Sequence, residues 1–233
     1  MRIAVISDIH SNLPALESAL NFARTLHIEA VYCLGDIVGY GAHPNECVEI
    51  IRREAAYVVR GNHDQATFDP GMLDSFSKTG RSSAEWTREH LSTENIEYLA
   101  SLPMRLEVEQ CTLAHASPSD PQRWEYVLSL DVAERQFDQF TTPLCFIGHT
   151  HYPMVCGEDL ETFDFKRGQR FLINVGSVGQ PRDHNPQLSF GVIDTATWEY
   201  RNYRLDYDAA KAAKAIRAAG LPRFFAKRLL QGV

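Results

Sequence analysis

The residues in this sequence that could do chemistry gather in five short polar strings. The strings are Asp8-Ile9-His10, Gly35-Asp36, Gly61-Asn62-His63-Asp64, His115 and His149-Thr150-His151, and they hold five of the nine histidines. Carboxylate, amide and imidazole side chains are ligands for divalent transition metals. Carboxylates that converge in a buried pocket would be costly without cations to neutralise them. If the strings meet in the fold, they predict a site for two divalent metal ions.

Each string also has a simpler interpretation when it is taken alone. Asp8 could cap a helix or a turn, Gly35-Asp36 could be a plain turn, and the string 61–64 could be a turn rich in Asn and Asp. His115 could be a structural histidine. His149 and His151 could be surface residues, although an extended segment would place both imidazoles on the same side. The presence of all five strings in one chain favours the shared site.

Apolar runs precede the strings and indicate the elements that must position them. Strand-like runs cover residues 2–7, 30–34, 56–60, 106–114 and 144–148. A helical pattern begins at Leu13, with Asn12 as its N-cap and Pro14 in its first turn, and another covers about 44–54. Ligands bind at the carboxyl ends of strands in α/β sheets. We therefore predict an α/β fold with a largely parallel or mixed sheet that is covered on both faces.

The remaining segments predict additions to this frame within a single domain of residues 1–233. Residues 65–105 are polar and helical, which indicates an inserted cap of two or three helices closed by Pro103. Further strands are expected at about 171–175, 188–194 and 198–205, a helix near 131–140, and a polar hairpin tip at 157–169. The tail from about residue 206 reads as helical, with Pro222 opening the last helix.

Composition and charge exclude several classes of protein. The chain has 233 residues, 44% of them hydrophobic, and a formal net charge of −7, so no general attraction to nucleic acid or to an anionic membrane is expected. No apolar run approaches the roughly 18 residues of a membrane helix, and no signal peptide is evident. Five cysteines without CxxC spacing indicate reduced, mostly buried thiols in a cytoplasmic protein. Oligomeric state stays open.

Together, the strings resemble the calcineurin-like metallophosphoesterase superfamily. The matching motifs are DIH (8–10), GDIVG (35–39), GNHD (61–64), AHAS (114–117) and GHTH (148–151). SDIHSN, GDIVGYG-x-HPNE and GSVGQPRD are similar to the small phosphoesterase branch of bacteria and archaea, with diadenosine-tetraphosphatase-like and phosphodiesterase-like members. The resemblance covers roughly residues 1–64 and 105–205. It implies a four-layer β-sandwich of two mixed sheets flanked by helices.

The resemblance also implies a dimetal phosphoesterase mechanism. Asp8, His10 and His151 would hold the first metal, Asn62, His115 and His149 the second, and Asp36 would bridge both. A metal-bridging hydroxide would attack phosphorus, and His63 would protonate the leaving oxygen. The metals expected are Mn, Fe, Zn, Co or Ni, with Mn favoured. The substrate would be a small phosphodiester, a phosphomonoester or a dinucleoside polyphosphate.

One departure from the superfamily concerns His63. Protein Ser/Thr phosphatases carry an aspartate-arginine pair after the second motif, where the aspartate orients the catalytic histidine. Gly39 and Tyr40 stand at these positions here. The departure argues against a protein phosphatase and leaves the orientation of His63 open.

Candidates for substrate contacts each have an alternative. Arg182 could bind a phosphate or form a surface salt bridge. Asn12 could contact a phosphoryl oxygen or cap its helix, and Tyr40 and His43 could touch a nucleobase or pack their loop. The basic tail could be a solvated helix face, a partner surface or a grip on a polyphosphate. Its basic residues are Lys211, Lys214, Arg217, Arg223, Lys227 and Arg228. For the whole protein, a non-catalytic interaction scaffold and a sensor that binds without turnover are the alternatives.

Overall fold

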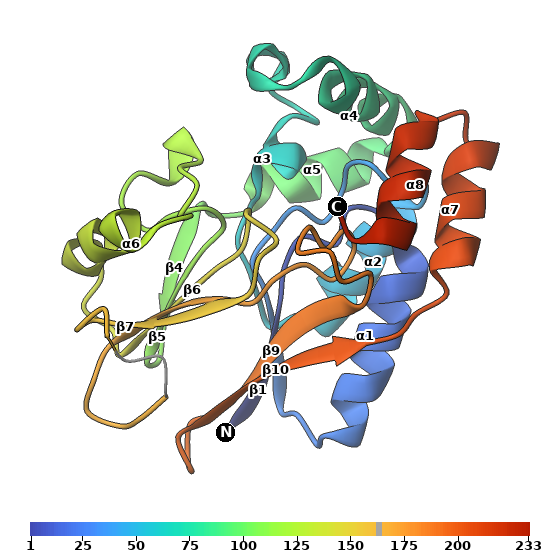
Figure 1. The fold of residues 1–233 in the computed structure, drawn as a ribbon. Helices are drawn as coiled ribbons and strands as arrows, with labels where there is room; N and C mark the ends of the chain where they lie inside the picture. Colours follow the sequence, from blue (N-terminus) through green and yellow to red (C-terminus); the bar gives the residue numbers. More distant parts are fainter. Residues whose placement is uncertain (162–164) are drawn as a thin grey trace.

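Two five-stranded sheets pack face to face in the structure, a computed structural model that describes residues 1–161 and 165–233 (Figure 1). Helices cover the outer face of each sheet, which gives four layers. Both sheets contain parallel and antiparallel strand pairs. The α/β sandwich of two mixed sheets expected from the sequence is therefore confirmed.

The first sheet contains the first strand of the chain, β1, and the last strand, β10. Its order is β10-β9-β1-β2-β3, with β1, β2 and β3 parallel and β9 antiparallel to β1. The strands are β1 (Arg2–Ile6), β2 (Ala30–Cys33), β3 (Tyr57–Val58), β9 (Leu188–Asp194) and β10 (Glu199–Leu205). Helices α1 (Leu13–Thr25) and α2 (Pro44–Glu54) connect the parallel strands. The predicted cap of α1 is present, since Asn12 Oδ1 accepts a hydrogen bond from Ala15 N at 3.3 Å.

The second sheet has the order β4-β5-β6-β8-β7, in which β5, β6 and β8 are parallel. Its strands are β4 (Arg105–Val108), β5 (Cys111–Ala114), β6 (Leu144–Ile147), β7 (Met154–Gly157) and β8 (Phe171–Asn174). The outer face is covered by α6 (Leu130–Gln136) and the 3₁₀ turn η3 (Phe137–Gln139), where one helix was predicted. A further 3₁₀ turn, η2 (Pro121–Arg123), lies between β5 and α6.

Three strand predictions need correction. The single strand expected at 106–114 is a hairpin, because Glu109 turns the chain at φ 51° and β4 pairs antiparallel with β5. Strand β7 was not predicted, and the strand at 56–60 shortens to two residues. The predicted hairpin tip at 157–169 does join the antiparallel pair β7 and β8, but residues 162–164 lie outside the described residues.

Alternate residues of the central strands enter different cores, which explains their continuous apolar runs. In β1, Ile3 and Val5 face the second sheet, whereas Ala4 and Ile6 face the helices. In β6, Phe146 enters the core between the sheets, and its neighbours in the strand pack toward α6. Burial on both faces fixes the register of these strands, because a slip of one residue would exchange the two sets.

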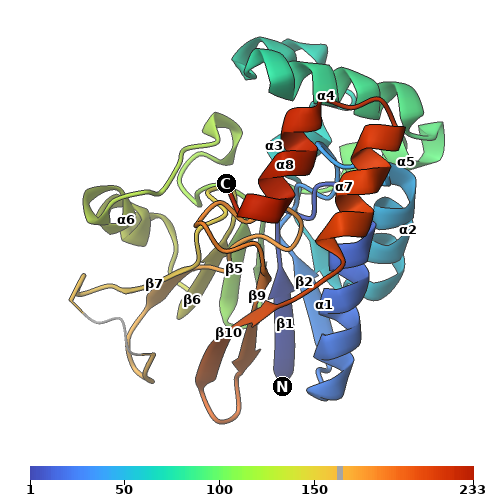
Figure 2. The ribbon, with the colours of Figure 1, turned by 45° about the vertical axis from the view of Figure 1, so that its right-hand side comes forward.

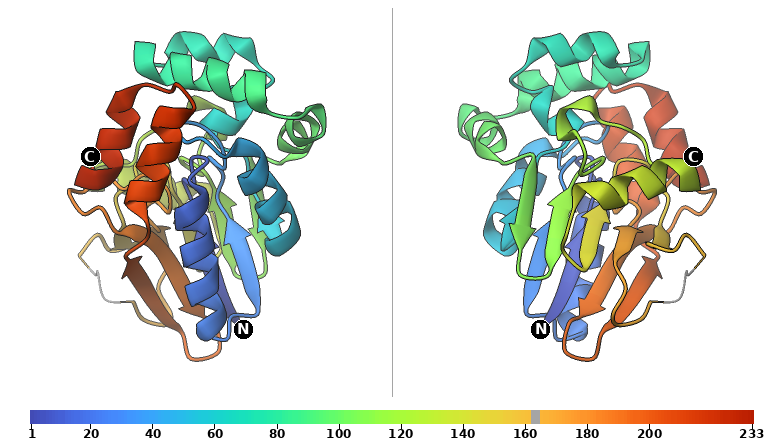
Figure 3. Two further views of the ribbon diagram at one scale, coloured as in Figure 1. Left: turned by 90° about the vertical axis from the view of Figure 1, so that its right-hand side faces the viewer. Right: turned by 90° about the vertical axis from the view of Figure 1, so that its left-hand side faces the viewer.

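Two helical segments lie over the carboxyl ends of the strands (Figures 2 and 3). The segment predicted as an insert, about 65–105, contains η1 (Pro70–Ser75), α4 (Lys78–His90) and α5 (Thr93–Ser101), and α3 (Asn62–Gln65) precedes it. The tail forms α7 (Ala209–Ala218) and α8 (Arg223–Gln231), and Pro222 is the N-cap of α8, as expected. Leu221, Phe225 and Leu229 of the tail pack with Tyr40 and Trp86.

The cysteines and the helices agree with the remaining sequence expectations. All five cysteines are free and buried, which confirms the interpretation as buried thiols. Within residues 1–161 and 165–233, no helix has the length and apolar character needed to cross a membrane.

Candidate metal centre

The five polar strings meet where the parallel strands of both sheets end. Asp8 and Asp36 follow β1 and β2, His115 follows β5, and His149 and His151 follow β6. The amide N–H of His149 donates to Asp8 Oδ2 at 3.0 Å, although 141 residues separate the two. The convergence of the strings is therefore confirmed. We call the seven predicted ligands the ligand cluster: Asp8, His10, Asp36, Asn62, His115, His149 and His151.

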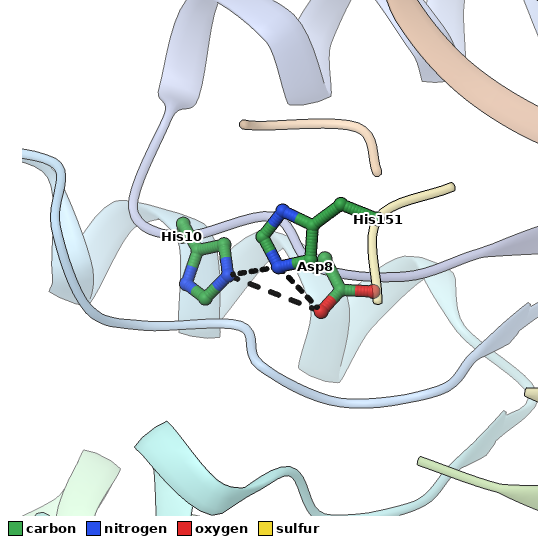
Figure 4. A group of neighbouring side chains, drawn as sticks. All are labelled: Asp8, His10 and His151. Carbon is green, nitrogen blue, oxygen red and sulfur yellow. Dashed lines mark hydrogen bonds and ion pairs between the residues drawn. The ribbon is translucent and has the colours of Figure 1, made fainter. Parts of the chain in front are cut away.

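The first ligand group consists of Asp8, His10 and His151, whose side chains point toward one another (Figure 4). The Nε2 atoms of His10 and His151 are 3.1 Å apart, and Asp8 Oδ1 lies 3.2 Å from the His151 nitrogen. Asp8 Oδ1 is buried and has no hydrogen-bond partner. All three side chains are at most 2% exposed, so solvent does not separate these atoms.

The second ligand group consists of Asp36, His115 and His149. His115 Nε2 lies 3.3 Å from Asp36 Oδ2 and 3.2 Å from His149 Nδ1. The same Asp36 oxygen is 3.7 Å from His10 Nε2, so this carboxylate lies between the two groups. Asn62 follows β3 at the start of α3, and its buried Oδ1 has no hydrogen-bond partner.

Backbone carbonyls fix the tautomers of three imidazoles. Each carbonyl accepts a hydrogen bond from an Nδ1 atom, so that atom carries the proton. The pairs are His10 with Val38, His115 with Leu34 and His151 with Gln180. The Nε2 lone pairs then face carboxylate oxygens and one another at about 3 Å, an arrangement that is repulsive without a cation or extra protons. The residues present therefore fit a divalent metal site.

The electrostatics of the site keep most of these groups ready for a cation. Burial lowers the pKa of His149 to about 3 and that of His63 to about 4. Burial acts in the same direction on His115, but the Asp36 carboxylate outweighs it and raises the pKa to about 9. Burial alone would raise the pKa values of Asp8 and Asp36, yet neighbouring imidazoles hold both well below the usual range. Both carboxylates are therefore ionised, the form that binds metal.

The backbone that carries the ligands is strained. Asp8, His10, Asp36, His149 and His151 all have φ between 50° and 65°, a region that residues other than glycine seldom adopt. The extended arrangement considered for His149 and His151 is therefore wrong. The bend after His149 sends its ring to the second group, and His151 joins the first. Strain of this kind concentrates at functional sites.

Asp64, the last residue of the string 61–64, is a positioning residue to which the sequence analysis gave no role of its own. It is fully buried, and its carboxylate accepts hydrogen bonds from the amides of Ile37, Val38 and Gly61. Asp64 therefore joins the loop that carries Asp36 to the loop that carries Asn62. Its signal in the sequence is its position directly after the Asn62-His63 pair, where a carboxylate can bond backbone amides.

His63 lies beside the ligand cluster and contacts Tyr40. Its amide donates to Asp36 Oδ1 at 2.8 Å, and its Nε2 lies 2.9 Å from the Tyr40 hydroxyl. The Tyr40 ring packs on that of His63, with centroids 4.4 Å apart, and Phe76 covers it at 4.7 Å. Gly39, at φ 98°, lets the loop approach the imidazole, where a Cβ would overlap it. The sequence left open which residue orients His63, and in the structure the partner of its ring is Tyr40.

A cleft of about 570 Å³ opens beside the ligand cluster, and some of the residues predicted to contact substrate line it. Tyr40 and Arg182 line it, together with His63, Asn62 and His149. Asn12 and His43 lie elsewhere. Asn12 donates to the Gly179 carbonyl and the Tyr207 hydroxyl besides capping α1, and His43 lies 3.4 Å from Glu46 at the start of α2. Of the four candidates, only Tyr40 and Arg182 reach this cleft.

The calcineurin-like phosphoesterase superfamily domain matches residues 1–197 of this chain. The chain belongs to this superfamily. Like other calcineurin-like phosphoesterases, it is a metal-dependent hydrolase of phosphoric esters. Helices α7 and α8 lie beyond the matched residues.

Similar proteins place this calcineurin-like phosphoesterase in the branch expected from the sequence. A metallophosphoesterase from Sphaerobacter thermophilus has a TM-score of 0.88 and 38% identity, with 100% of this chain and 99% of that chain covered. An uncharacterised protein of Methanocaldococcus jannaschii is 40% identical over 240 residues, which span 99% of this chain and 98% of the relative. Phosphodiesterase YfcE of Escherichia coli is 26% identical over 204 residues, with coverages of 83% and 88%.

Proposed function

We propose that the chain is a dimetal phosphoesterase that acts on a small phosphorylated molecule: a phosphodiester, a phosphomonoester or a dinucleoside polyphosphate. The observation that carries this proposal is the position of Asp36 between two ligand groups, 3.7 Å from His10 and 3.3 Å from His115. A carboxylate has two oxygens and can serve two metals about 4 Å apart. A cleft of about 570 Å³ suits a small molecule.

The ligand cluster divides into two sets around Asp36. Asp8, His10 and His151 would hold the first metal. Asn62, His115 and His149 would hold the second, and the unpartnered Oδ1 of Asn62 supports its place there. Mixed oxygen and nitrogen ligands fit Mn, Fe, Co, Ni or Zn, and the carboxylate and amide oxygens make Mn²⁺ our first choice.

When bound, the metals would activate water as the nucleophile and neutralise charge on the phosphoryl oxygens. His63 would supply a proton to the leaving oxygen. Burial keeps His63 neutral in the free cleft, because its pKa is lowered to about 4. An anionic substrate beside the ring favours the protonated form, so we expect His63 to take up its proton as the substrate enters. Tyr40 would hold the ring in place through its hydroxyl.

A scaffold or a sensor without turnover would not need an acid beside the ligand cluster. The grouping of six of the seven expected ligands and the placement of His63 at 2.9 Å from Tyr40 both support an enzyme. No observation in the described residues favours either alternative.

The test is hydrolysis of bis(p-nitrophenyl) phosphate and p-nitrophenyl phosphate by manganese-reconstituted protein, with metal content measured in parallel. We expect two metals per chain and a loss of about a thousandfold in kcat for Asp36→Asn. His63→Ala should keep both metals and lose about a hundredfold. Arg223→Met, an exposed change on α8, serves as the control. Two bound metals with full activity in Asp36→Asn would refute the proposal.

A further inference from the structure

The cleft beside the ligand cluster has a wall that the metal site does not require. We call five of its residues the cleft wall: Phe76, Trp124, Tyr126, Arg182 and Arg228. They come from the insert, the loop between β5 and α6, the turn after β8, and α8. The wall combines aromatic rings with guanidinium groups, the side chains that bind aromatic and phosphate-bearing ligands.

Arg182 and Arg228 are half-buried, and neither forms an ion pair with an Asp or Glu side chain among the described residues. Arg182 donates to Gln180 Oε1 at 3.2 Å, but its buried Nε has no hydrogen-bond partner. Arg228 donates to the Val233 carbonyl oxygen. Arg204 differs, because it pairs with Asp183, the neighbour of Arg182 in the chain.

The two arginines also act on each other. Both guanidinium groups line the same cleft, and burial together with the positive charge of Arg182 lowers the pKa of Arg228. Two half-buried like charges that no Asp or Glu side chain neutralises favour an anion between them. Guanidinium groups bind phosphate oxygens through paired, charge-assisted hydrogen bonds.

The position of the arginines indicates which phosphate they would bind. The Arg182 guanidinium carbon lies 5.9 Å from the centre of the Tyr40 ring, and the Tyr40 hydroxyl bonds His63. Arg228 and Tyr40 line the same adjoining pocket, together with Phe225 of α8. Both arginines therefore lie on the side of His63, the side on which the leaving oxygen departs in the proposed reaction.

We propose that Arg182 and Arg228 bind a phosphate of the leaving group, so that the enzyme prefers substrates with a second phosphate joined to the reacting one. In that reaction, the oxygen of water forms a new bond to the reacting phosphorus. The bond from phosphorus to the bridging oxygen breaks, and its electron pair stays on that oxygen, which takes a proton. Two phosphate compounds leave, with no change in oxidation state. The inference rests on the proposed function and narrows its substrate class.

Equilibrium binding of a probe that cannot be cleaved tests the subsite without turnover. Manganese-loaded wild type is titrated with inorganic phosphate and with methylenediphosphonate, the form of pyrophosphate in which CH₂ replaces the bridging oxygen, and the ratio of the two dissociation constants is measured. We expect this pyrophosphate analogue to bind about 10- to 100-fold more tightly than phosphate. Arg182→Met and Arg228→Met, which keep most of the apolar stem, should each reduce this ratio about tenfold. Arg228→Lys should restore part of it, and Arg223→Met on the same helix should leave it unchanged.

Kinetics give a second readout. For each arginine variant, kcat/KM for a dinucleoside polyphosphate should fall about tenfold further than kcat/KM for bis(p-nitrophenyl) phosphate. If the dinucleoside polyphosphate binds more tightly than the pyrophosphate analogue, the additional affinity would indicate that a nucleobase stacks on the aromatic residues of the cleft wall.

The outcomes separate the two proposals. Equal losses on both substrates, or no preference for the pyrophosphate analogue in an active wild type, would overturn the arginine subsite and leave the phosphoesterase function standing. A retained preference for the analogue in a protein that hydrolyses no ester would overturn the function and support the subsite.

Discussion

Backbone at the ends of two sheets holds the ligand cluster, whereas the cleft wall comes from four segments that no sheet connects. The ligands are at most 8% exposed, and carbonyls of neighbouring loops fix three of the imidazoles. In the wall, Tyr126 is 49% exposed, and Trp124 lies in a loop at φ 52°. The difference indicates that the chemistry is fixed before the substrate arrives, while recognition depends on surface segments that can vary.

Metal removal should have the largest effect, because it acts only on the ligand cluster. A ligand at a thousand times its dissociation constant stabilises the native state by about 4 kcal/mol. We expect chelation to lower the melting temperature by roughly 10 °C, measured by thermal unfolding of manganese-loaded and chelated protein. Chelation should lower the melting temperature of the wall variant Tyr126→Ala by the same amount, and that of Asp36→Asn by much less. An unchanged melting temperature after complete metal removal would contradict the prediction.

Gly61→Ala should damage the ligand cluster through a single methyl group. Gly61 has φ −94°, which any residue can adopt, but an added Cβ would overlap Asp36. Overpacking of this kind costs about 3 kcal/mol and should displace the carboxylate between the metals. Urea unfolding and metal content are the measurements. Gly80→Ala, in α4 beside the wall, is the matched change and should cost no stability, since a helical alanine is favourable. Equal stability of the two variants would contradict the expected overlap.

Tyr40→Phe tests the boundary between cluster and wall. The change removes the hydroxyl that contacts His63 and keeps the ring that packs on Phe225 and His10. We expect kcat to fall about tenfold for a phenyl ester, whose leaving group needs a proton, and about twofold for a p-nitrophenyl ester. Steady-state kinetics across aryl esters of different acidity measure this. A uniform fall for all esters, or a change in KM alone, would assign Tyr40 to binding.

The ligand cluster and the cleft wall also differ in how far the sequence could predict them. Each ligand follows an apolar run or lies in a short polar string, so the position of Asp8 or His115 at the end of a strand can be predicted from the sequence. The wall has no such pattern, because tertiary packing alone brings Phe76 and Arg228 to the same cleft. The hairpin at Glu109 lies within the single strand predicted at 106–114. Strand β7 is as long as β6, which was predicted, but it runs directly into the segment predicted as a hairpin tip. The role of Asp64 was missed because its three partners are backbone amides, which leave no side-chain signature.

The last prediction concerns thiol reactivity, for which we expect the smallest effect on stability. It compares the buried sheets and helices with the cleft wall directly. The native cysteines lie in the buried frame, and burial raises the pKa of Cys111 to about 12. At pH 8 only about one Cys111 thiol in ten thousand is then ionised, and the thiolate is the reactive form. Raising the pH increases that fraction, but burial still limits access. We therefore expect no rapid reaction of the native protein with a disulfide reagent. Tyr126→Cys in the wall should add one fast thiol, because that position is half exposed. A fast native thiol would show that the sheets open as readily as the wall, and the contrast between the two regions would fail.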